Sequence, residues 1–431
     1  MLEIGVLRLH GAVQHYAWGG CDFIPSLLGI ANNERKPFAE LWMGAHPKGP
    51  ATADVAGIKI PLDRLIAEAP GKILGSAASA RFGGRLSYLL KVLDVAKMLS
   101  IQAHPTKKQA AEGFAHENAA GIDLQASARN YKDDSDKPEV AVALTEFWML
   151  HGFRPLEQIA EMLRTIPELH SIMPDFSEKL VRIEDTVQAR RGLIQELYRA
   201  VMTTPQDRTD LLLNTLIARL ARTDTSDKND PGYWVARASE TFCPVDGHCD
   251  RGIFSIYLLN LLHLRPGQGT FQSAGTLHAY LEGVTVELMA NSDNVLRGGL
   301  TRKHVDVPGL MRILSFDSGL PVVMNGVHRG ASERVYQTPS DEFELRSINL
   351  EPGEQYLGNA VYGPDTIIVM NGTATLIANG QSTALTRGTI IFAPFGMHYS
   401  LHSSAERARL FKASVPCTDR MRGWRTATPA V

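Results

Sequence analysis

Residues 262–280 read LHLRPGQGTFQSAGTLHAY, and the features of this stretch return near the C-terminus of the chain. A short apolar run meets a Pro-Gly turn in LHLRPGQ (262–268) and again in INLEPGE (348–354). A glycine and then a histidine follow downstream, in AGTLHAY (274–280) and in PFGMHYS (394–400). Short runs separated by turns are typical of antiparallel strands. Because the same features recur in the same order, we predict two related β regions.

The segments around these motifs have the same β-type pattern. Many short strands joined by regular turns are typical of a sandwich or jelly roll, and Asn-Gly turns, here at 371–372 and 379–380, are strong hairpin signals. The predicted strand runs are Ile256–Leu264 and Gly269–Gln272 in the first region, and Phe343–Leu350, Thr366–Met370, Thr373–Ala378 and Thr389–Phe392 in the second, which begins at about Asp341.

The chain before the first of these regions, from about Phe153 to Pro244, has a different period. Apolar residues recur there every three or four positions, which is the spacing of one helix face. Examples are Leu156, Ile159, Met162, Leu163 and Ile166, followed by Leu193, Ile194, Leu197 and Val201. We therefore predict an all-helical segment here.

Length and composition limit the classes of function. The 431 residues exceed the ~100–200 of one domain, so two or three domains are expected. The formal net charge of -2 gives no basic excess for nucleic acid or anionic lipid, and no apolar run approaches the ~18 residues of a membrane span. An anionic ligand would therefore need a local cluster of cations. We predict a monomer or a weak homo-oligomer that binds neither nucleic acid nor membrane.

The N-terminus and the cysteines indicate a cytoplasmic protein. Residues 1–13 carry Glu3 and Arg8 and lack the hydrophobic run of a secretory signal. Cys21, Cys243, Cys249 and Cys417 contain no CxxC pair, a pattern that suits a reducing compartment better than a disulfide framework. Their spacing also matches no zinc module, so we expect four free cysteines.

Polar residues of a metal-binding type gather between positions 100 and 139. Gln102 and His104 are two residues apart in SIQAHP, a spacing that directs both side chains to one face of a strand. Glu139 follows in KPE, and His278 lies in the repeated GTLHAY segment. Taken singly, each is most often an ordinary structural residue. Together, an amide oxygen, two imidazoles and a carboxylate form a mixed donor set that zinc accepts.

Several segments together resemble type I phosphomannose isomerases, in the order found in that family. The last of them is a long and specific run, and the resemblance extends from about residue 14 to about residue 303. The segments are QHYAWGG (14–20), AELWMGAHPKGPA (39–51), LLKVLDVAKMLSIQAHP (89–105), NYKD with KPE (130–139) and GTLHAYLEGVTVELMANSDNVLRGGLTRK (275–303).

The resemblance implies a fold of two cupin-like jelly-roll barrels plus an all-α domain, so the fold class is mainly β with a helical insertion. The expected catalytic domain is 1–152 together with 245–330, the helical domain is 153–244, and the C-terminal cupin-like domain is 331–431. His398 has no pair of histidines upstream in the second barrel, so we expect no metal there. The implied pathway is mannose metabolism, including GDP-mannose biosynthesis.

The resemblance also implies an activity and a set of site residues. The activity is zinc-dependent interconversion of mannose 6-phosphate and fructose 6-phosphate through an enediol, with one Zn²⁺ per chain and a small sugar phosphate as ligand. The metal ligands fall on Gln102, His104, Glu139 and His278. The catalytic residues would be Glu287 for proton transfer, Arg297 for developing oxygen charge and Lys137 beside the metal. The phosphate would be held by Lys91, Ser100 and Lys303.

Several alternatives remain open at this point. Glu287 could orient a metal ligand instead of transferring the proton, in which case zinc-bound water would be the main rival base. Lys137 could merely neutralise nearby carboxylates. The chain could be a different metal-dependent cupin enzyme, or a non-catalytic bicupin that binds sugar. There is also one departure from the family, whose members commonly carry Asn-His before KPE, where this chain has Ser135-Asp136.

Overall fold

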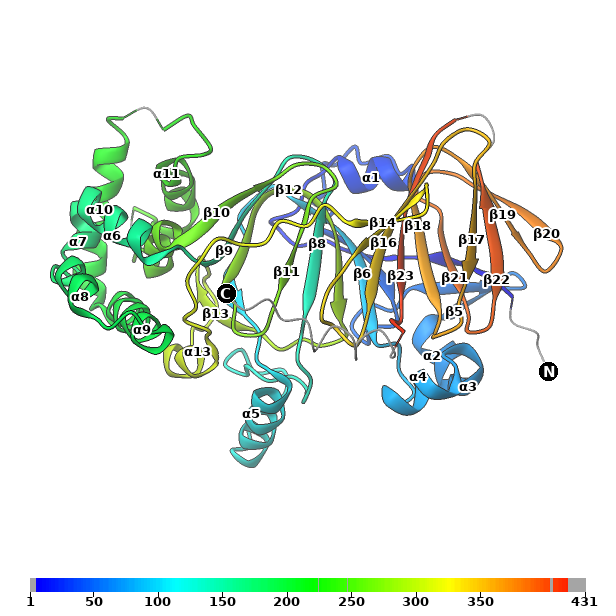
Figure 1. The fold of residues 1–431 in the computed structure, drawn as a ribbon, viewed down its shortest axis with the longest axis horizontal. Helices are drawn as coiled ribbons and strands as arrows, with labels where there is room; N and C mark the ends of the chain where they lie inside the picture. Colours follow the sequence, from blue (N-terminus) through cyan, green and yellow to red (C-terminus); the bar gives the residue numbers. More distant parts are fainter. Residues whose placement is uncertain (1–4, 224, 246, 404–405, 418–431) are drawn as a thin grey trace.

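The computed structural model describes residues 5–223, 225–245, 247–403 and 406–417, and its strands form three sheets (Figure 1). The prediction of a mainly β chain is confirmed. The central sheet has ten strands and runs β10-β9-β12-β6-β3-β2, with β7, β8, β11 and β13 paired off this path. Its strands are β2 (Ala12–Gln14), β3 (Glu40–Gly44), β6 (Tyr88–Val95), β7 (Ile101–Ala103), β8 (Glu139–Ala143), β9 (Phe147–Phe153), β10 (Leu259–Leu264), β11 (Gly269–Gln272), β12 (His278–Ala290) and β13 (Leu296–Gly299).

Two further sheets, built mostly from C-terminal strands, lie beside the central sheet (Figure 1). The nine-stranded sheet, in the order β14-β15-β16-β23-β18-β21-β1-β4-β5, consists of β14 (Val327–Arg329), β15 (Glu333–Tyr336), β16 (Glu344–Leu350), β23 (Ala408–Ser414), β18 (Asp365–Asn371), β21 (Ile390–Ala393), β1 (Leu7–His10), β4 (Thr52–Val55) and β5 (Ile58–Pro61). The four-stranded sheet consists of β17 (Gln355–Asn359), β22 (His398–His402), β19 (Ala374–Ala378) and β20 (Gln381–Leu385).

Successive side chains of a strand point to opposite faces of its sheet, and the pattern of apolar residues determines which face is buried in which core. All eight residues of β6 are buried. Leu90 and Val92 belong to the apolar core between the central and nine-stranded sheets, whereas Leu93 belongs to a smaller core on the opposite side. Lys91 shares this second side because it alternates with Leu90 and Val92. We call this second side of β3, β6, β12, β8 and β11 the site face.

Helices are the other regular elements of the described structure. All the regular elements between Leu156 and Phe242 are helices, and they share one apolar core with β9, β12 and β13. They are α6 (Leu156–Thr165), α7 (Pro167–His170), α8 (Phe176–Arg182), α9 (Val187–Thr203), α10 (Gln206–Leu220) and α11 (Pro231–Phe242). The remaining helices are α1 (Phe23–Leu28), α2 (Leu62–Glu68), α3 (Pro70–Ile73), α4 (Ser76–Arg81), α5 (Lys107–Ala119), η1 (Arg251–Phe254), α12 (Ser255–Leu258) and α13 (Val307–Ile313).

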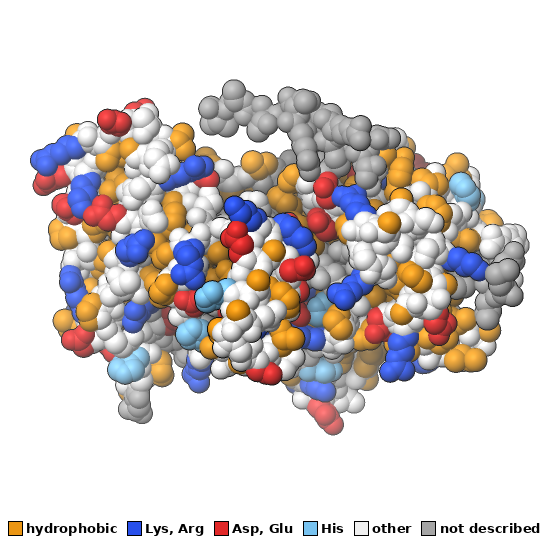
Figure 2. Space-filling model, turned by 90° about the horizontal axis from the view of Figure 1, so that it is seen from below, with side chains coloured by type: hydrophobic (Ala, Val, Ile, Leu, Met, Phe, Trp, Pro, Cys, Tyr) orange, Lys and Arg blue, Asp and Glu red, His pale blue; other side chains and the backbone are white. Residues whose placement is uncertain are grey.

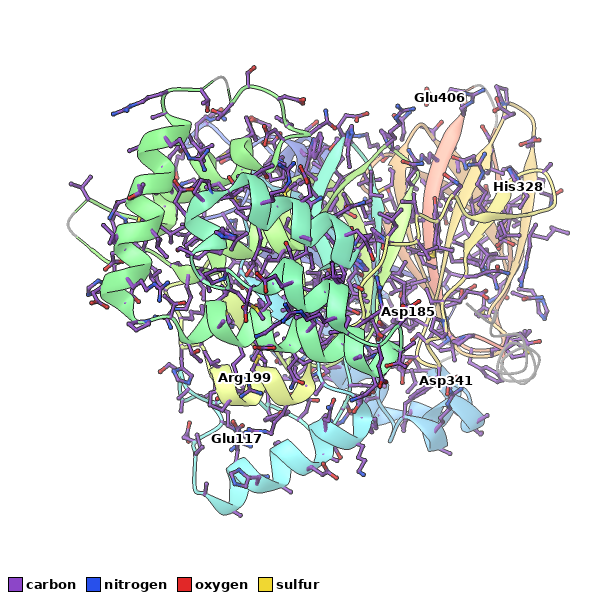
Figure 3. The ribbon with its side chains drawn as sticks, turned by 60° about the vertical axis from the view of Figure 1, so that its left-hand side comes forward. Glu117, Asp185, Arg199, His328, Asp341 and Glu406 are labelled. Atoms are coloured by element: carbon purple, nitrogen blue, oxygen red, sulfur yellow. A yellow bond between two sulfur atoms is a disulfide. The ribbon has the colours of Figure 1, made fainter. Side chains whose placement is uncertain are left out.

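The helical segment and the C-terminal sheets lie at opposite ends of the molecule (Figure 1). In Figure 3, Arg199 marks the helices, while His328 and Glu406 mark the far sheets. Asp341 lies beside the short helices α2 to α4, where it pairs with Arg81 at 3.2 Å. The central sheet therefore has helices at one end and the other sheets at the other.

The N-terminal strand joins the far end of the chain. β1 pairs with β21 through Leu7 and Phe392, and with β4 on its other side. Residues that the sequence assigned to the catalytic domain thus share a sheet with C-terminal strands. The predicted division into three domains stays a prediction.

Two details of the sequence analysis are wrong. The run Ile256–Leu264 is only partly a strand, because Ser255–Leu258 forms α12 before β10 begins at Leu259. Cys243 and Cys249 are not free but form a disulfide. Cys243 follows the end of α11, and the Cys249 amide donates a hydrogen bond to Asp210 of α10 at 2.8 Å.

The surface shows no large field of one charge on the face in Figure 2, where Lys and Arg are interspersed with Asp and Glu. This agrees with the small net charge of the sequence. Among the described residues, no helix is long and apolar enough to cross a membrane.

Candidate metal centre

Strand register brings distant parts of the sequence to one place. β7 lies between β12 and β13, where Gln102 is directly opposite both His278 and Arg297. Directly opposite residues of antiparallel strands project to the same face. His104 follows the end of β7, and Glu139 is the first residue of β8. The four predicted ligands therefore come from three strands and the residue after one of them.

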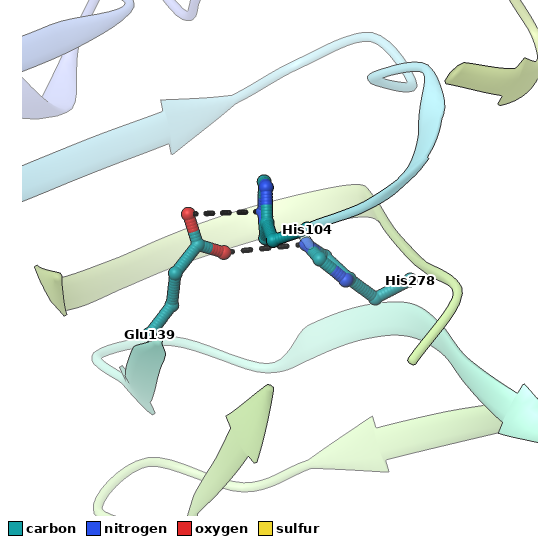
Figure 4. Close-up of side chains that lie close together, drawn as sticks. All are labelled: His104, Glu139 and His278. Atoms are coloured by element: carbon teal, nitrogen blue, oxygen red, sulfur yellow. Dashed lines mark ion pairs between the residues drawn. The ribbon is translucent and has the colours of Figure 1, made fainter. Parts of the chain in front are cut away.

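His104, Glu139 and His278 form a tight buried cluster (Figure 4). Their nearest ligand atoms all lie within 4.8 Å of one another, and each side chain is at most 2% exposed. Glu139 Oε1 is 3.4 Å from His104 Nε2, and Glu139 Oε2 is 3.2 Å from His278 Nε2. The Gln102 amide nitrogen lies 3.4 Å from the same His278 Nε2. All four predicted ligands are thus brought together.

The outer ring nitrogens of both histidines are engaged by backbone carbonyls. His104 Nδ1 donates to the oxygen of Asn294 at 2.7 Å, and His278 Nδ1 donates to the oxygen of Thr276 at 3.0 Å. This assigns the proton to Nδ1 and leaves Nε2 with a free lone pair facing the cluster, as in metal-binding histidines. Burial lowers the pKa of His104 to about 4, so its imidazole is neutral at pH 7.

Glu139 is ionised although it is fully buried. Burial alone would raise its pKa, but the Lys137 ammonium, 2.8 Å from Oε1, holds that pKa well below its usual range. The cluster therefore contains one carboxylate with a single positive neighbour.

Two buried atoms of the cluster lack a hydrogen-bond partner. Among the buried side-chain atoms of the described residues, His104 Nε2 and Glu139 Oε2 make no hydrogen bond. An unpaired buried polar atom costs about 1–3 kcal/mol, so such atoms indicate a missing partner. Two imidazole nitrogens, a carboxylate oxygen and an amide are a suitable donor set for zinc. The residues present therefore fit a zinc ion.

A second group of buried charges lies on the site face next to this cluster. Lys91 Nζ is 3.1 Å from Glu287 Oε2 and 3.5 Å from Glu40 Oε2, and Tyr280 donates to Glu287 Oε1 at 2.8 Å. Burial would lower the pKa of Lys91, but the carboxylates of Glu40 and Glu287 raise it. Burial raises the pKa of Glu287, and the Lys91 charge opposes that rise.

The other predicted site residues lie at different depths. Arg297, opposite Gln102, is half-buried, and burial lowers its pKa. Lys303 is largely exposed in the loop after β13, and its pKa is lowered by partial burial and by the charges of Arg297 and Lys48. No ion pair among the described residues includes either cation, whereas Lys91 has two partners. Ser100 is half-buried just before β7.

Lys303 also lines a cavity of about 480 Å³ beside the helical segment. Arg251 and Arg302 share this cavity, but both guanidinium groups donate to backbone carbonyls, of Met202 and Thr241 respectively. Of the three cations that line this cavity, only Lys303 has no ion pair or side-chain hydrogen bond among the described residues.

The sequence analysis missed three residues near the metal centre. Glu40 pairs with Lys91, Tyr280 holds Glu287, and His151 lies opposite His278 with its pKa lowered to about 4 by burial and by His278. Glu40 and Tyr280 stand in the quoted segments AELWMG and GTLHAY. Their position in those segments was the available signal, whereas nothing in the local pattern singled out His151.

Asp136, the departure from the family pattern, is half-buried three residues before Glu139. Burial raises its pKa, and Lys107 partly offsets that rise. His46, in the AHPKGPA segment, is 3.4 Å from Asp293 and accepts the Lys48 amide at 3.2 Å. It therefore belongs to a turn and not to the metal cluster.

Comparisons with known proteins agree on one family. Residues 6–156 match the family described as "Phosphomannose isomerase type I, catalytic domain". The mannose-6-phosphate isomerase of Salmonella typhimurium is 35% identical over 387 residues, covering 89% of this chain and 94% of the relative. The human mannose-6-phosphate isomerase is 34% identical, with coverage of 90% and 93%.

Solved structures lead to the same family. A crystal structure of mannose 6-phosphate isomerase from Salmonella typhimurium, bound to its substrate and to a zinc atom, has a TM-score of 0.84 and 33% identity. The match covers 96% of this chain and 100% of that one. A zinc-bound holo structure of mannose 6-phosphate isomerase has the same TM-score, identity and coverage.

Proposed function

The chain belongs to the family of type I mannose-6-phosphate isomerases, and from this premise we propose that it interconverts mannose 6-phosphate and fructose 6-phosphate at one zinc ion. The observation that carries the proposal is the buried cluster of His104, Glu139 and His278, in which His104 Nε2 and Glu139 Oε2 have no hydrogen-bond partner among the described residues.

Gln102, His104, Glu139 and His278 would hold the zinc ion. Bound zinc would supply Lewis acidity toward a substrate oxygen. The carbonyls of Asn294 and Thr276 keep both imidazoles in the tautomer that presents Nε2. Lys137 holds one oxygen of Glu139, which leaves the other oxygen directed at the cluster.

Glu287 is the proposed proton carrier. Aldose–ketose isomerisation through an enediol removes a proton from one of C1 and C2 and returns a proton to the other. A base for this step has to be ionised and fixed in position. Lys91 favours the ionised form of Glu287, and Lys91 and Tyr280 each hold one of its oxygens. Glu40 keeps Lys91 protonated from the other side.

Cations without partners would bind the charged parts of the substrate. Arg297 lies directly opposite Gln102, where it is suited to oxygen charge that develops during the reaction. Lys303 and Ser100 remain the proposed phosphate-binding residues. Lys91 was expected to share that role, but its two carboxylate partners make it better suited to holding Glu287.

The broader expectations also stay proposals. We propose two cupin-like jelly-roll barrels and a separate helical domain, since an all-helical segment interrupts the strands of the central sheet and further sheets follow it. A cytoplasmic location, a monomeric or weakly associating state and a sugar phosphate as the physiological ligand are proposed with them. The free cysteines Cys21 and Cys417 support the location, and the disulfide does not.

The test is an assay of purified protein with mannose 6-phosphate and with fructose 6-phosphate. Activity should disappear after chelation and return with zinc. Undiminished turnover by fully metal-stripped protein would refute the zinc mechanism. No turnover by the zinc-loaded protein would refute the activity itself and favour a bicupin that only binds sugar.

A further inference from the structure

The site face continues past Glu139 onto the next strand. Gln272 of β11 is directly opposite Glu139 of β8, and two residues earlier Thr270 is opposite Ala141. Across β8, Ala141 is opposite Glu287. Because directly opposite residues share a face, Gln272 and Thr270 belong to the same surface as the metal cluster and the proposed base.

Gln272 is fully buried and has no hydrogen bond to its side chain. It is 0% exposed, and neither the amide oxygen nor the amide nitrogen has a partner among the described residues. The hydroxyl of Thr270, 1% exposed, is unpartnered as well. A buried amide can accept two hydrogen bonds and donate two. Leaving all of them unmade is costly, so this position is built to receive a polar partner.

The neighbouring described protein groups do not satisfy the Gln272 amide. Glu139 Oε1 is paired with Lys137, and Oε2 faces His278. His151 Nε2 donates to the Phe271 backbone oxygen at 3.2 Å, which ties β9 to β11 beside Gln272. The partner of Gln272 therefore comes from outside the described protein groups.

We propose that Gln272 is a substrate-binding residue that hydrogen-bonds a sugar hydroxyl beside Glu139. A hydroxyl both donates and accepts, and so it matches the donor and acceptor ends of an amide. The inference rests on the proposed function and extends it, because it assigns a residue that discriminates between sugars by their hydroxyl groups. A site built to hydrogen-bond a hydroxyl discriminates strongly against analogues that lack it.

The test replaces Gln272 with methionine, which has a similar shape without the amide. Gln272→Met should lower kcat/KM for mannose 6-phosphate by about 10- to 100-fold, the range for an unmade hydrogen bond to a buried group. Metal-free Gln272→Met should also bind mannitol 6-phosphate, a polyol that cannot isomerise, more weakly in calorimetry. The Tm of the ligand-free protein should rise or stay unchanged, because an unpaired buried amide is removed.

Tyr257→Phe is the matched control. It removes another buried polar atom without a partner, the Tyr257 hydroxyl, which packs in the core shared with the helical segment. This variant should leave kcat/KM and mannitol 6-phosphate affinity unchanged. Assays with mannose 6-phosphate derivatives that each lack one hydroxyl, at C3, C4 or C5, should identify the hydroxyl that Gln272 binds. The derivative that lacks it should react poorly with the wild type and be affected least by Gln272→Met.

Each other outcome has a definite meaning. A lower Tm with unchanged kinetics and polyol affinity would show that internal water satisfies Gln272, and it would overturn the inference. A lower zinc affinity with unchanged polyol affinity in the metal-free protein would make Gln272 a metal ligand and overturn it too. A wild type that neither turns over nor binds these sugars would refute the proposed function itself, a result distinguishable from the first two.

Discussion

The molecule contains two buried clusters of charged and polar side chains, and they differ in how completely their atoms are paired. In the metal centre, His104 Nε2, Glu139 Oε2 and both amide atoms of Gln272 are without hydrogen-bond partners. The second cluster lies between the nine- and four-stranded sheets. There Asp365 accepts hydrogen bonds from Tyr399 at 2.7 Å and Ser414 at 2.6 Å, and lies 3.5 Å from Lys412.

The rest of the second cluster is paired in the same way. Glu333 accepts hydrogen bonds from Tyr356 at 2.8 Å and from Arg346 at 3.0 Å, and the Lys412 ammonium lies over the Tyr356 ring. Burial alone therefore does not identify a functional site. Unpaired atoms in the first cluster indicate a ligand to be bound, whereas complete pairing in the second indicates a structural role.

The largest expected effect is at the metal centre. His278→Ala should reduce zinc affinity by more than about 100-fold, the upper range for residues that only orient a ligand, and should abolish turnover. The matched control is His398→Ala, because His398 occupies the equivalent place in the sequence repeat but is exposed on β22. Zinc content by atomic absorption and isomerase rate are the measurements. Equal effects of the two substitutions would show that His278 has no special role in zinc binding.

The second cluster should respond in stability instead of activity. Asp365→Asn leaves Lys412 buried without its counter-charge, and breaking a buried ion pair costs about 3–5 kcal/mol. Urea unfolding should detect this loss, while kcat/KM of the folded protein stays unchanged. The double variant Asp365→Asn/Lys412→Met removes both charges and should recover most of the loss. A fall in kcat/KM at low urea would place this cluster in the catalytic apparatus.

Arg297 tests whether an unpaired cation at the site is functional. Arg297→Ala should retain zinc and lower kcat by about 100- to 1,000-fold, as for the loss of one group that stabilises oxygen charge. Arg297→Lys, which keeps the charge, should recover part of the rate. Arg346→Lys in the second cluster is the comparison and should alter stability alone. A near-normal rate in Arg297→Ala would contradict the assigned role.

The local turns of the fold were predictable from the sequence, and the long-range pairing was not. The turn Asn379-Gly380 is confirmed, with positive φ angles of 51° and 73° that these residues tolerate best. The pairing of Leu7 with Phe392 has no local signal, because it depends on which surfaces remain to be buried after both regions fold. The α12 helix was missed for a related reason, since a short apolar run suits a buried helix or a buried strand.

The metal cluster was predictable because its residue types are uncommon in combination. His104, Glu139 and His278 come together as expected. Glu40 and Gln272 were not foreseen. A buried acid or amide looks in sequence like an exposed one, and only the register of β11 against β8 places Gln272 beside Glu139. Register is specified by the whole sheet and not by the strand alone.

The smallest expected effect is on the pH dependence of stability, to which the carboxyl groups of Asp94 and Glu333 should contribute with opposite signs. Burial raises the pKa of Asp94 on β6 to about 6, and no ion pair among the described residues includes it. Burial also raises the pKa of Glu333, but the Arg346 charge and Tyr356 bring it below its usual value.

The folded protein therefore holds the Asp94 proton more tightly than the unfolded chain, so stability should decline as pH rises from about 4 to about 6. Glu333 has the opposite sign, because its contribution is present above the unfolded pKa and is lost as pH falls through the folded one. Asp94→Asn should remove the first slope and Glu333→Gln the second, as measured by urea unfolding between pH 3.5 and 7. If Asp94→Asn instead steepened the decline above pH 4, Asp94 would have a cationic partner and would belong with the paired cluster.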